Sequence, residues 1–471
     1  MTNLAELAKK KGIKYFLISF TDMFGVMRSK LVPTAAMAAM QKNGAGFAGF
    51  ATHLDLTPAD PDMFAIPDAD SLIQLPWKKE VAWVSSDLVM DGRPLEQAPR
   101  QVLKQVTAAA AKVGYVFKTG VECEFFLLEG DSCHPRLARG SRDAEKKEVE
   151  AMNNTSTGSV YSHRSPHKAG MTKLADRSDT QLKPCYDQHA LMRQYDLISE
   201  LCDHMQTLGW GPYQNDHEDG NGQFEMNWDY AEALTTANRH AFFKFMTRTL
   251  AEKYGMRASF MPKPFAGLTG SGCHMHFSLW DKTGKKNLFA DSKGELGLSK
   301  LAYHFLGGVL NEASALCAIT NPTVNSYKRI NAPVTASGST WSPNTISYTG
   351  NNRTHMVRIP DSDRFEIRLP DGAANPYLLP AVVLAAGLAG MANKIDPGKR
   401  LDNNMYETPD PKVGRLPQTL HDALGQLEQS KVLKAGLSEN FVASYLKLKR
   451  GEWNRYLGQV SAWERETYLD V

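Results

Sequence analysis

The sequence has few cysteines and little excess of either charge. Six cysteines are spread irregularly over 471 residues without metal-type spacing, so we expect free thiols in a reducing cytoplasm. Lysine and arginine number 54 against 51 aspartates and glutamates, with both signs interspersed, which gives no reason to expect nucleic acid or a membrane as partner. No apolar run reaches transmembrane length, and no signal-peptide-like apolar region follows the first residues. These absences favour a cytoplasmic globular protein.

The common nucleotide-binding motifs are also missing. There is no G-x-x-x-x-G-K-[ST] loop and no protein-kinase signature set, so any nucleotide site must be of another type. What stands out is a glycine-rich turn at 261–272 that leads into His274, His276 and Ser278. Residues two apart on a strand share a face, and glycines let the backbone approach a charged ligand. The segment suggests metal and phosphate, although alone it could be an ordinary polar strand face.

Two further segments carry paired carboxylates. Glu122 and Glu124 precede the apolar run 125–128, which predicts a central strand with both carboxylates on one face. Burying them is tolerable if a cation neutralises their charge. Glu218 and Glu225 are separated by a glycine-rich turn and are expected on adjoining strands. Each segment alone could be a solvated face, but together with the histidines they suit Mg²⁺ or Mn²⁺ rather than structural zinc.

Arginines lie close in sequence to the carboxylates. Arg364, Glu366 and Arg368 alternate with apolar residues and so are expected to face together. Five arginines in the second half of the chain are candidates for the site: Arg329, Arg353, Arg358, Arg364 and Arg368. The guanidinium group is a fork-shaped donor to carboxylates and phosphates. Divalent metal, arginine and a glycine-rich turn together indicate phosphoryl transfer.

The pattern of elements indicates an α+β fold. Short strands are predicted at 15–20, 71–75 and 80–84, and helices at 100–113, 189–208, 231–254 and 298–316. Pro99 is expected to open the helix at 100–113, and the apolar run 380–390 is expected to form a buried helix. Strands and helices do not alternate as parallel crossover units, which favours α+β over α/β.

Five motifs resemble, in order, those of the glutamine synthetase family. They are E-x-E-F-F at 122–126, H-E…G-Q-x-E at 217–225, K-P…T-G-S-G-x-H-x-H-x-S at 263–278, N-P-T-x-N-S-Y-K-R at 321–329 and R-x-E-x-R-x-P-D…N-P-Y at 364–377. Segments near both ends are similar as well, so the resemblance covers nearly the whole chain. It implies a β-grasp N-terminal domain at 1–95 and a catalytic domain at 96–471 with a curved antiparallel sheet and helices. It also implies a homo-oligomer, a dodecamer of two hexameric rings with sites between subunits.

The resemblance implies an activity and assigns roles by position. A glutamate carboxylate attacks the γ-phosphate of ATP, and an amine then displaces phosphate from the γ-glutamyl phosphate. The implied ligands of two or three Mg²⁺ or Mn²⁺ ions are Glu124, Glu218 and Glu225 on the glutamate and amine side, and Glu122, His274 and Glu366 on the ATP side. The implied glutamate contacts are Gly270, Arg329 and Arg368, the phosphate contacts Arg353, Arg358 and Arg364, and the nucleotide-side residues His276, Ser278 and Trp280.

Two departures from the family pattern concern the amine. Ammonia-using members have an aspartate where this chain has Ala48, and a flap glutamate where it has Asn331, followed by an added stretch at 334–350. Losing two acids makes the site poorer for ammonium and better for a methylated amine, since one buried CH₂ group contributes about 0.8 kcal/mol. We therefore favour methylamine. The pattern at 331–355 is similar both to γ-glutamylmethylamide synthetases and to type III glutamate–ammonia ligases, so ammonia stays open.

Without these acids, another group must take the amine proton. Tyr186 stands where the family has a tyrosine near the amine, and the adjacent Asp187 is our candidate base. Arg353 is expected to act on the transferred phosphoryl group. Asp187 is equally well placed in sequence to be the N-cap of a helix that starts at Gln188.

The remaining features are less informative. Residues 132–181 have no counterpart in the family and are expected to form a polar surface insertion. Its histidines His134, His163 and His167 are alternative metal ligands, but the default for all three is a surface position. Tyr406 lies near the position where some members are adenylylated, but its surroundings differ, so no such control is predicted. Two alternatives remain, a bulkier amine substrate and a non-catalytic role. The six retained metal ligands argue against a non-catalytic role.

Overall fold

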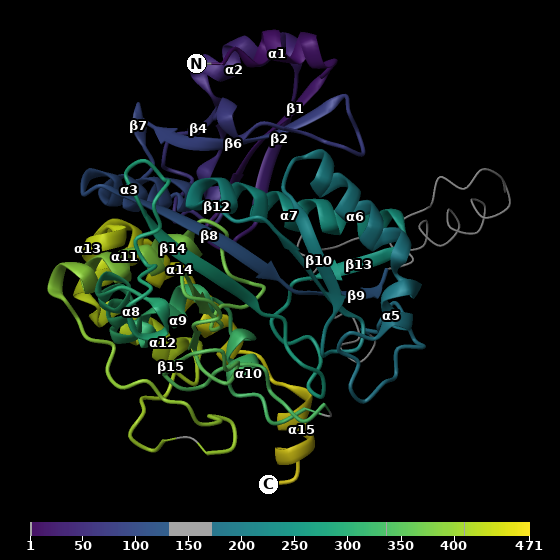
Figure 1. Cartoon of the computed structure of the whole chain (residues 1–471). Helices are drawn as coiled ribbons and strands as arrows, with labels where there is room; N and C mark the ends of the chain where they lie inside the picture. Colours follow the sequence, from purple (N-terminus) through teal and green to yellow (C-terminus); the bar gives the residue numbers. More distant parts are fainter. Residues whose placement is uncertain (1, 131–171, 336, 409) are drawn as a thin grey trace, which may run out of the picture.

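The computed structural model describes residues 2–130, 172–335, 337–408 and 410–471. Most of the predicted insertion at 132–181, including His134, His163 and His167, lies outside these ranges. The described chain forms a small β-rich N-terminal unit beside a larger unit of sheets and helices, which confirms the expected α+β class (Figure 1). None of the described helices is both long enough and apolar enough to cross a lipid bilayer.

The N-terminal unit is built on a seven-stranded sheet. Its order is β2-β1-β6-β4-β3, with β5 and β7 also paired to β6. The elements are α1 (Leu4–Lys11), β1 (Tyr15–Thr21), β2 (Met27–Pro33), α2 (Met37–Asn43), β3 (Ala45–Phe47), β4 (Met63–Pro67), β5 (Ile73–Gln74), β6 (Val81–Met90) and β7 (Arg93–Pro94). Alternation along β1 buries Phe16, Ile18 and Phe20. The strand predicted at 71–75 is shorter than expected, because Ser71 ends a 3₁₀ turn in which its hydroxyl donates to the Asp68 carbonyl.

Two sheets form the framework of the larger unit. The six-stranded sheet has the order β12-β8-β14-β17-β16-β15, and the four-stranded sheet has the order β10-β11-β9-β13. The strands are β8 (Tyr115–Cys123), β9 (Phe125–Glu129), β10 (Pro212–His217), β11 (Gln223–Trp228), β12 (Ala231–Glu232), β13 (Met256–Ser259), β14 (Cys273–Asp281), β15 (Tyr348–Thr349), β16 (Val357–Arg358) and β17 (Phe365–Ile367).

The chain passes from one sheet to the other at Glu124. β8 ends at Cys123 and β9 begins at Phe125 in the other sheet, so the single strand predicted here is in fact two. The Glu124 N–H donates to the Gly272 carbonyl at 3.2 Å, which holds this junction against the turn before β14. The junction therefore brings the end of one sheet next to the other.

Helices pack around the sheets and form the C-terminal part. They are α3 (Pro99–Lys112), α5 (Gln188–Arg193), α6 (Tyr195–Thr207), α7 (Ala233–Lys253), α8 (Lys300–Asn311), α9 (Ala313–Thr320), α10 (Ser326–Ile330), α11 (Leu378–Asn393), α12 (Leu420–Gln429), α13 (Lys431–Leu437), α14 (Glu439–Leu457) and α15 (Ala462–Tyr468). Pro99 opens α3 and α11 is buried, as predicted. The helices predicted at 189–208 and 298–316 are each divided, because Gln194 and Glu312 leave helical geometry.

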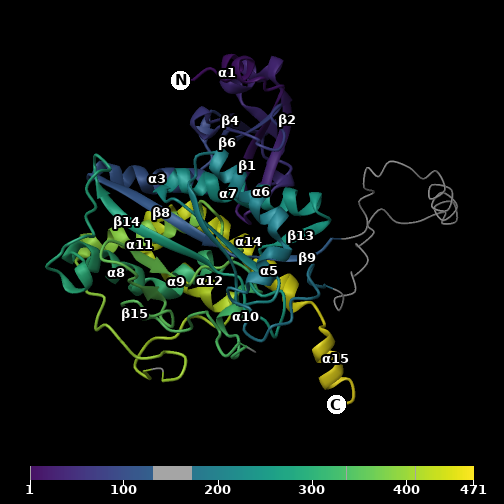
Figure 2. The same cartoon turned by 45° about the vertical axis from the view of Figure 1, so that its right-hand side comes forward.

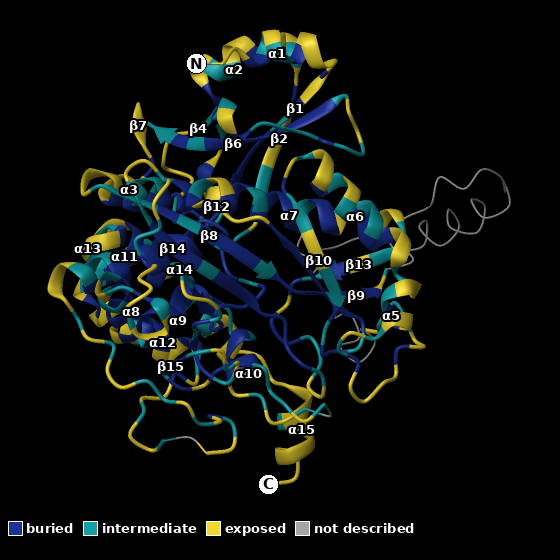
Figure 3. Cartoon of the chain, in the orientation of Figure 1, coloured by how far each residue is buried: buried dark blue, intermediate teal, exposed yellow. Residues whose placement is uncertain are grey.

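Buried hydrogen bonds connect the N-terminal unit to the larger one. Ser85 on β6 bonds Tyr377 at 2.9 Å, and the Asn375 amide donates to the Asp22 carbonyl at 2.8 Å. The strands β8 and β14 are largely buried beneath their surroundings, whereas α15 is exposed and extends away from the body (Figures 2 and 3). We propose a domain boundary near residue 95, between β7 and α3.

Candidate active site

A cavity of ≈ 560 Å³, here called the central cavity, lies where the two sheets meet. Its walls come from the β8–β9 junction, the β10–β11 hairpin, the start of β14 and the arginine-bearing segments that follow. Of the residues predicted from sequence, it is lined by Glu122, Glu124, Tyr186, Glu218, Glu225, Gly270, His274, Arg329, Arg353, Arg358 and Arg368. Segments spread over some 250 residues thus contribute to one site, as the motif pattern predicts.

One group of ligand atoms is centred on Glu122. Its carboxylate oxygens lie 2.8 Å from His276 Nε2 and 3.4 Å from His274 Nδ1, which confirms that the two histidines share a strand face. Glu366 approaches from β17, with Oε1 3.7 Å from His274 Nδ1. Burial lowers the pKa of His274 to about 4, so the ring is neutral at pH 7, and its buried Nε2 has no hydrogen-bond partner. A neutral, unpartnered imidazole nitrogen beside carboxylates fits a metal ligand.

A second group consists of carboxylates alone. Oxygens of Glu124, Glu218 and Glu225 lie within 4.8 Å of one another. Burial raises the pKa of Glu124 to about 7 and, together with the neighbouring acids, raises the pKa values of Glu218 and Glu225 well above their ordinary range. Three like charges at this separation, two of them buried and one half-buried, need a compensating cation, and hard divalent ions prefer oxygen donors. The donor set therefore fits Mg²⁺ or Mn²⁺.

Arginines also line the central cavity, next to the first group of ligand atoms. Glu366 accepts from Arg358 and from Arg368, each at 2.7 Å, and Arg329 donates to the Leu369 carbonyl at 2.9 Å. Gly270 lies directly against Arg329. A Cβ at Gly270 would lie 2.4 Å from the Pro262 carbonyl oxygen and 2.9 Å from Arg329 Cγ, so only glycine fits there. The wall can hold carboxylate and phosphate groups in fixed positions.

A second cavity of ≈ 330 Å³, here called the side cavity, borders the first at Glu122. The predicted residues His276, Ser278, Trp280 and Arg364 line it. The Trp280 indole donates to Ser278 Oγ at 2.9 Å, and Arg364 Nε donates to His276 Nδ1 at 3.1 Å. An aromatic wall next to a guanidinium suits a planar heterocycle that carries phosphates.

Several residues that line the side cavity were not predicted from the sequence. Lys118 Nζ lies 3.9 Å from the centre of the Trp280 ring, and Tyr230 stacks on the same ring at 6.3 Å. Lys118 could have been found, because it shares a strand face with Glu122 at even spacing. Tyr230 comes from the short segment before α7 and carries no sequence signal of its own.

On the amine side of the central cavity, the structure gives Asp187 a capping role and adds an aspartate that was not predicted. Tyr186 lines the cavity with a positive φ of 66°, and burial raises its pKa to about 12. Asp187 caps α5, accepting from the His189 and Ala190 N–H groups at 2.7 and 2.9 Å, which confirms the N-cap alternative. Its role as a base stays a prediction. Asp219, missed in the sequence, lines the cavity and accepts from Thr269 at 2.6 Å and from Ser337.

The two positions that depart from the family pattern do not line this cavity. Ala48 is exposed on the N-terminal unit, just after β3. The Asn331 amide donates to the carbonyls of Tyr327 and Gln418 at 2.8 and 2.9 Å. From the added stretch at 334–350, Ser337 and Trp341 reach the cavity instead.

Comparisons with known proteins agree with this geometry. The glutamine synthetase catalytic domain matches residues 96–468. The chain belongs to the glutamine synthetase family. It is thereby placed among the ATP-dependent glutamate–amine ligases. A glutamine synthetase of Rhizobium meliloti (strain 1021) is 56% identical over 474 residues, covering 100% of this chain and 99% of that protein.

Two other members of the family bear on the substrate. A glutamate–methylamine ligase of Methyloversatilis universalis is 39% identical over 474 residues, with 99% of this chain and 98% of that protein covered. A solved structure described as "GmaS/ADP complex-Conformation 1" is 55% identical, with both chains covered completely and a TM-score of 0.89. Full coverage of both chains supports a shared architecture from the first strand to the last helices.

Proposed function

We propose that this enzyme joins L-glutamate to methylamine, forming γ-glutamylmethylamide with ATP as co-substrate. The observation that carries the ligase chemistry is the pair of ligand groups around Glu122 and Glu124, which share one cavity with the buried arginines Arg329 and Arg368. The preference for methylamine is supported by the absence of acids at Ala48 and Asn331, and by likeness to a glutamate–methylamine ligase. The enzyme is proposed to work in the cytoplasm.

The residues divide the reaction between them. Arg329 and Arg368, with the close backbone approach at Gly270, are proposed to hold glutamate so that a γ-carboxylate oxygen attacks the γ-phosphorus of ATP. As the new O–P bond forms, the bond to the ADP oxygen breaks, and Arg353, Arg358 and Arg364 stabilise the charge on the phosphoryl oxygens.

The second step uses the amine side. The neutral amine nitrogen attacks the acyl carbon of γ-glutamyl phosphate, the C–O bond to phosphate breaks, and the amine proton passes to a base, for which Asp187 is our candidate. Two or three Mg²⁺ or Mn²⁺ ions held by the six ligands would act as Lewis acids on the phosphates and neutralise the buried carboxylates. His276, Ser278 and Trp280 are proposed to hold the nucleotide in the side cavity.

Ammonia is the second candidate amine. It is favoured by the 56% identical relative named glutamine synthetase and by two acids in the central cavity, Asp216 and Asp219. Burial raises the pKa of Asp216 to about 6. Carboxylates at these positions could attract ammonium in place of the two acids that the chain lacks.

The exposed position of Ala48 fits an assembled site. We propose the family's dodecamer of two hexameric rings, in which Ala48 would face the site of a neighbouring subunit. Light scattering coupled to gel filtration gives the molar mass, and a monomer with full activity would refute this arrangement.

Phosphate release separates the substrates. The purified enzyme with ATP, Mg²⁺ and L-glutamate is titrated separately with methylamine, ammonium, ethylamine and putrescine. We expect saturation at low methylamine concentration and a much higher requirement for ammonium. Equal or better use of ammonium would make the enzyme a glutamine synthetase, and no release with any amine would refute the ligase itself.

A further inference from the structure

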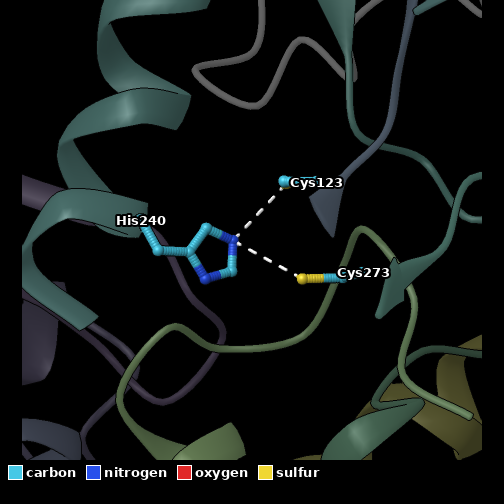
Figure 4. A group of neighbouring side chains, drawn as sticks. All are labelled: Cys123, His240 and Cys273. Atoms are coloured by element: carbon cyan, nitrogen blue, oxygen red, sulfur yellow. Dashed lines mark hydrogen bonds between the residues drawn. The ribbon is translucent and has the colours of Figure 1, made fainter. Parts of the chain in front are cut away.

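A cluster of three soft ligand groups lies behind the carboxylates. Alternation along β8 and β14 turns Glu122 and His274 toward the central cavity, and Cys123 and Cys273 toward the opposite face, where α7 packs. There both cysteines contact His240 of α7, and Figure 4 shows the three residues with a dashed line from the imidazole to each cysteine. The cysteine side chains are 0% exposed and His240 is 1% exposed. The cluster is therefore separate from the oxygen-rich site and closed to solvent.

The two nitrogen–sulfur distances match a shared cation, and all three ligand atoms lie within 4.8 Å of one another. The Nε2 atom of His240 lies 3.5 Å from Cys123 Sγ and 3.8 Å from Cys273 Sγ. Metal–sulfur bonds of about 2.3 Å and metal–nitrogen bonds of about 2.0 Å separate ligand atoms by about 3.5–3.8 Å, at angles between tetrahedral and trigonal. A single imidazole nitrogen carries one proton or one lone pair, so it can hydrogen-bond to only one sulfur at a time, and the other thiol can then bond only to the first. A cation would bind both sulfurs and the nitrogen at once.

The backbone holds the two sulfurs together without the help of a ligand. Cys123 and Cys273 are direct partners in the antiparallel β8–β14 ladder. The bond from the Glu124 N–H to the Gly272 carbonyl flanks the pair, so the cysteines occupy a non-hydrogen-bonded position, where Cα atoms lie about 4.5 Å apart. The third ligand comes from a 21-residue helix packed on these strands. A site built on rigid elements needs little rearrangement to bind a cation.

A buried positive charge beside the cluster has no carboxylate as its hydrogen-bond acceptor. Lys244 lies one turn after His240 on α7 and is buried, and its Nζ donates to the carbonyls of Gly372 and Ala374 at 2.8 and 3.1 Å. Burying an ammonium group is costly unless an anion lies near it. Asp371 is one such anion, and two thiolates beside a monovalent cation would add a further net negative charge near Lys244.

We propose that Cys123, Cys273 and His240 form a structural site for a thiophilic closed-shell cation, Cu⁺ or Zn²⁺, that ties α7 to the catalytic strand pair. Thiolate and imidazole ligands select these ions over Mg²⁺ and Mn²⁺. Binding releases the two thiol protons to solvent as the two metal–sulfur bonds form. The site is independent of the amine preference and of the ions at the carboxylates.

Metal retention by matched variants tests the proposal. Reduced enzyme is loaded anaerobically with Cu⁺ or, separately, with Zn²⁺, washed with a competing chelator and analysed for bound metal. Because Cys185 and Cys202 are partly exposed and can also take up soft ions, the measured quantity is the difference between variants. Cys123→Ser, Cys273→Ser and His240→Gln are each expected to retain one equivalent per chain less than wild type. Cys317→Ser, which removes another buried thiol, should retain the wild-type amount. Equal retention by all five proteins would overturn the proposal.

A measurement on the wild type covers the case in which a variant does not fold. X-ray absorption of the loaded, washed enzyme should show two sulfur ligands at about 2.3 Å and one nitrogen at about 2.0 Å. A shell of oxygen and nitrogen ligands only would contradict the site. Mass spectrometry of peptides alkylated without reduction is the second check, since a disulfide between Cys123 and Cys273 in the purified enzyme would also overturn it. The preferred metal is the ion that the enzyme retains against the chelator of higher affinity.

Discussion

Arg368 and Glu366 form a buried ion pair, in which Arg368 Nη1 donates to Glu366 Oε1 at 2.7 Å. Burial raises the pKa of Glu366, but the charges of Arg368, His276 and His274 together outweigh burial and lower this pKa to about 2. The carboxylate also accepts from Arg358 at 2.7 Å and faces His274. A residue proposed to bind metal thus also orients two arginines proposed to bind glutamate and phosphate.

Replacing this carboxylate should remove both functions. For Glu366→Ala we expect loss of ATP turnover by at least about 100-fold, because charge stabilisation in the transition state is lost. The unfolding free energy should fall by about 3–5 kcal/mol, since two buried guanidiniums lose their partner. Coupled-enzyme assay and urea unfolding give the two values. Glu428→Ala, which breaks the exposed pair with Arg450, is the control and should cost under about 1 kcal/mol without changing turnover. Appreciable ATP turnover in Glu366→Ala would refute the metal assignment.

The metal-free enzyme should lose stability as pH rises above 6.5. The folded-state pKa values of Glu124, Glu218 and Glu225 are raised, Glu124 to about 7, so the folded protein binds more protons than the unfolded chain in this range. Stability therefore falls with increasing pH. The lowered pKa of Glu366 acts well below this window, and the lowered pKa of His274, about 4, opposes the effect only up to about pH 7.5, since unfolded histidine titrates near 6.5. Thermal unfolding in EDTA from pH 6.5 to 8.5 measures the effect.

A charge-neutral variant separates this explanation from general alkaline instability. Glu225→Gln should raise the melting temperature of the metal-free enzyme at pH 8.5, because one buried charge is removed, and should lose most of the stabilisation by Mg²⁺. A metal-free wild type whose melting temperature rises across the window would contradict the like-charge cluster.

A methyl group at Gly270 should weaken glutamate binding. In Gly270→Ala the new Cβ must displace Arg329 or the Pro262 carbonyl, so the KM for glutamate should rise by roughly tenfold or more, about 1.4 kcal/mol. The KM for ATP should change little. Gly267→Ala is the matched control, since its Cβ would meet nothing within 4 Å. Equal effects of the two substitutions on the KM for glutamate would argue against the close approach.

The two roles of Asp187 can be told apart by a cap-competent substitution. Asparagine is as good an N-cap as aspartate, so Asp187→Asn should keep the melting temperature, whereas Asp187→Ala should cost about 1 kcal/mol. If Asp187 is the base, both variants lose amine-dependent turnover by about 100-fold. Normal turnover in Asp187→Asn would show that Asp187 acts only as a helix N-cap. Asp219→Asn would then be the next variant to assay for loss of the base.

The sequence predicted the site better than the strands that carry it. Alternating residues such as His274 and His276 share a face because β14 is regular, and that pattern is visible in one dimension. The junction at Glu124 was not predicted, because an apolar run looks the same whether it continues in one sheet or crosses to another. Glu366 on β17 and Arg368 directly after it face together as predicted, although β17 spans only three residues.

Contacts between segments far apart in the sequence could not be predicted. Asp219 meets Ser337 and Thr269 only through the folding of three loops, and no spacing in the sequence relates them. The cysteines were expected to be free thiols without metal-type spacing. Cys123 and Cys273 lie together because β8 and β14 pair in register, which sequence spacing does not reveal.

The central claim, a glutamate ligase that prefers methylamine, is tested most directly by competition. Methylamine and ammonium are supplied at equal concentration with L-glutamate, ATP and Mg²⁺, and mass spectrometry measures the ratio of γ-glutamylmethylamide to glutamine at early times. We expect at least about ten times more γ-glutamylmethylamide than glutamine, which corresponds to a difference of about 1.4 kcal/mol in activation free energy between the two amines. Glutamine as the main product would contradict it.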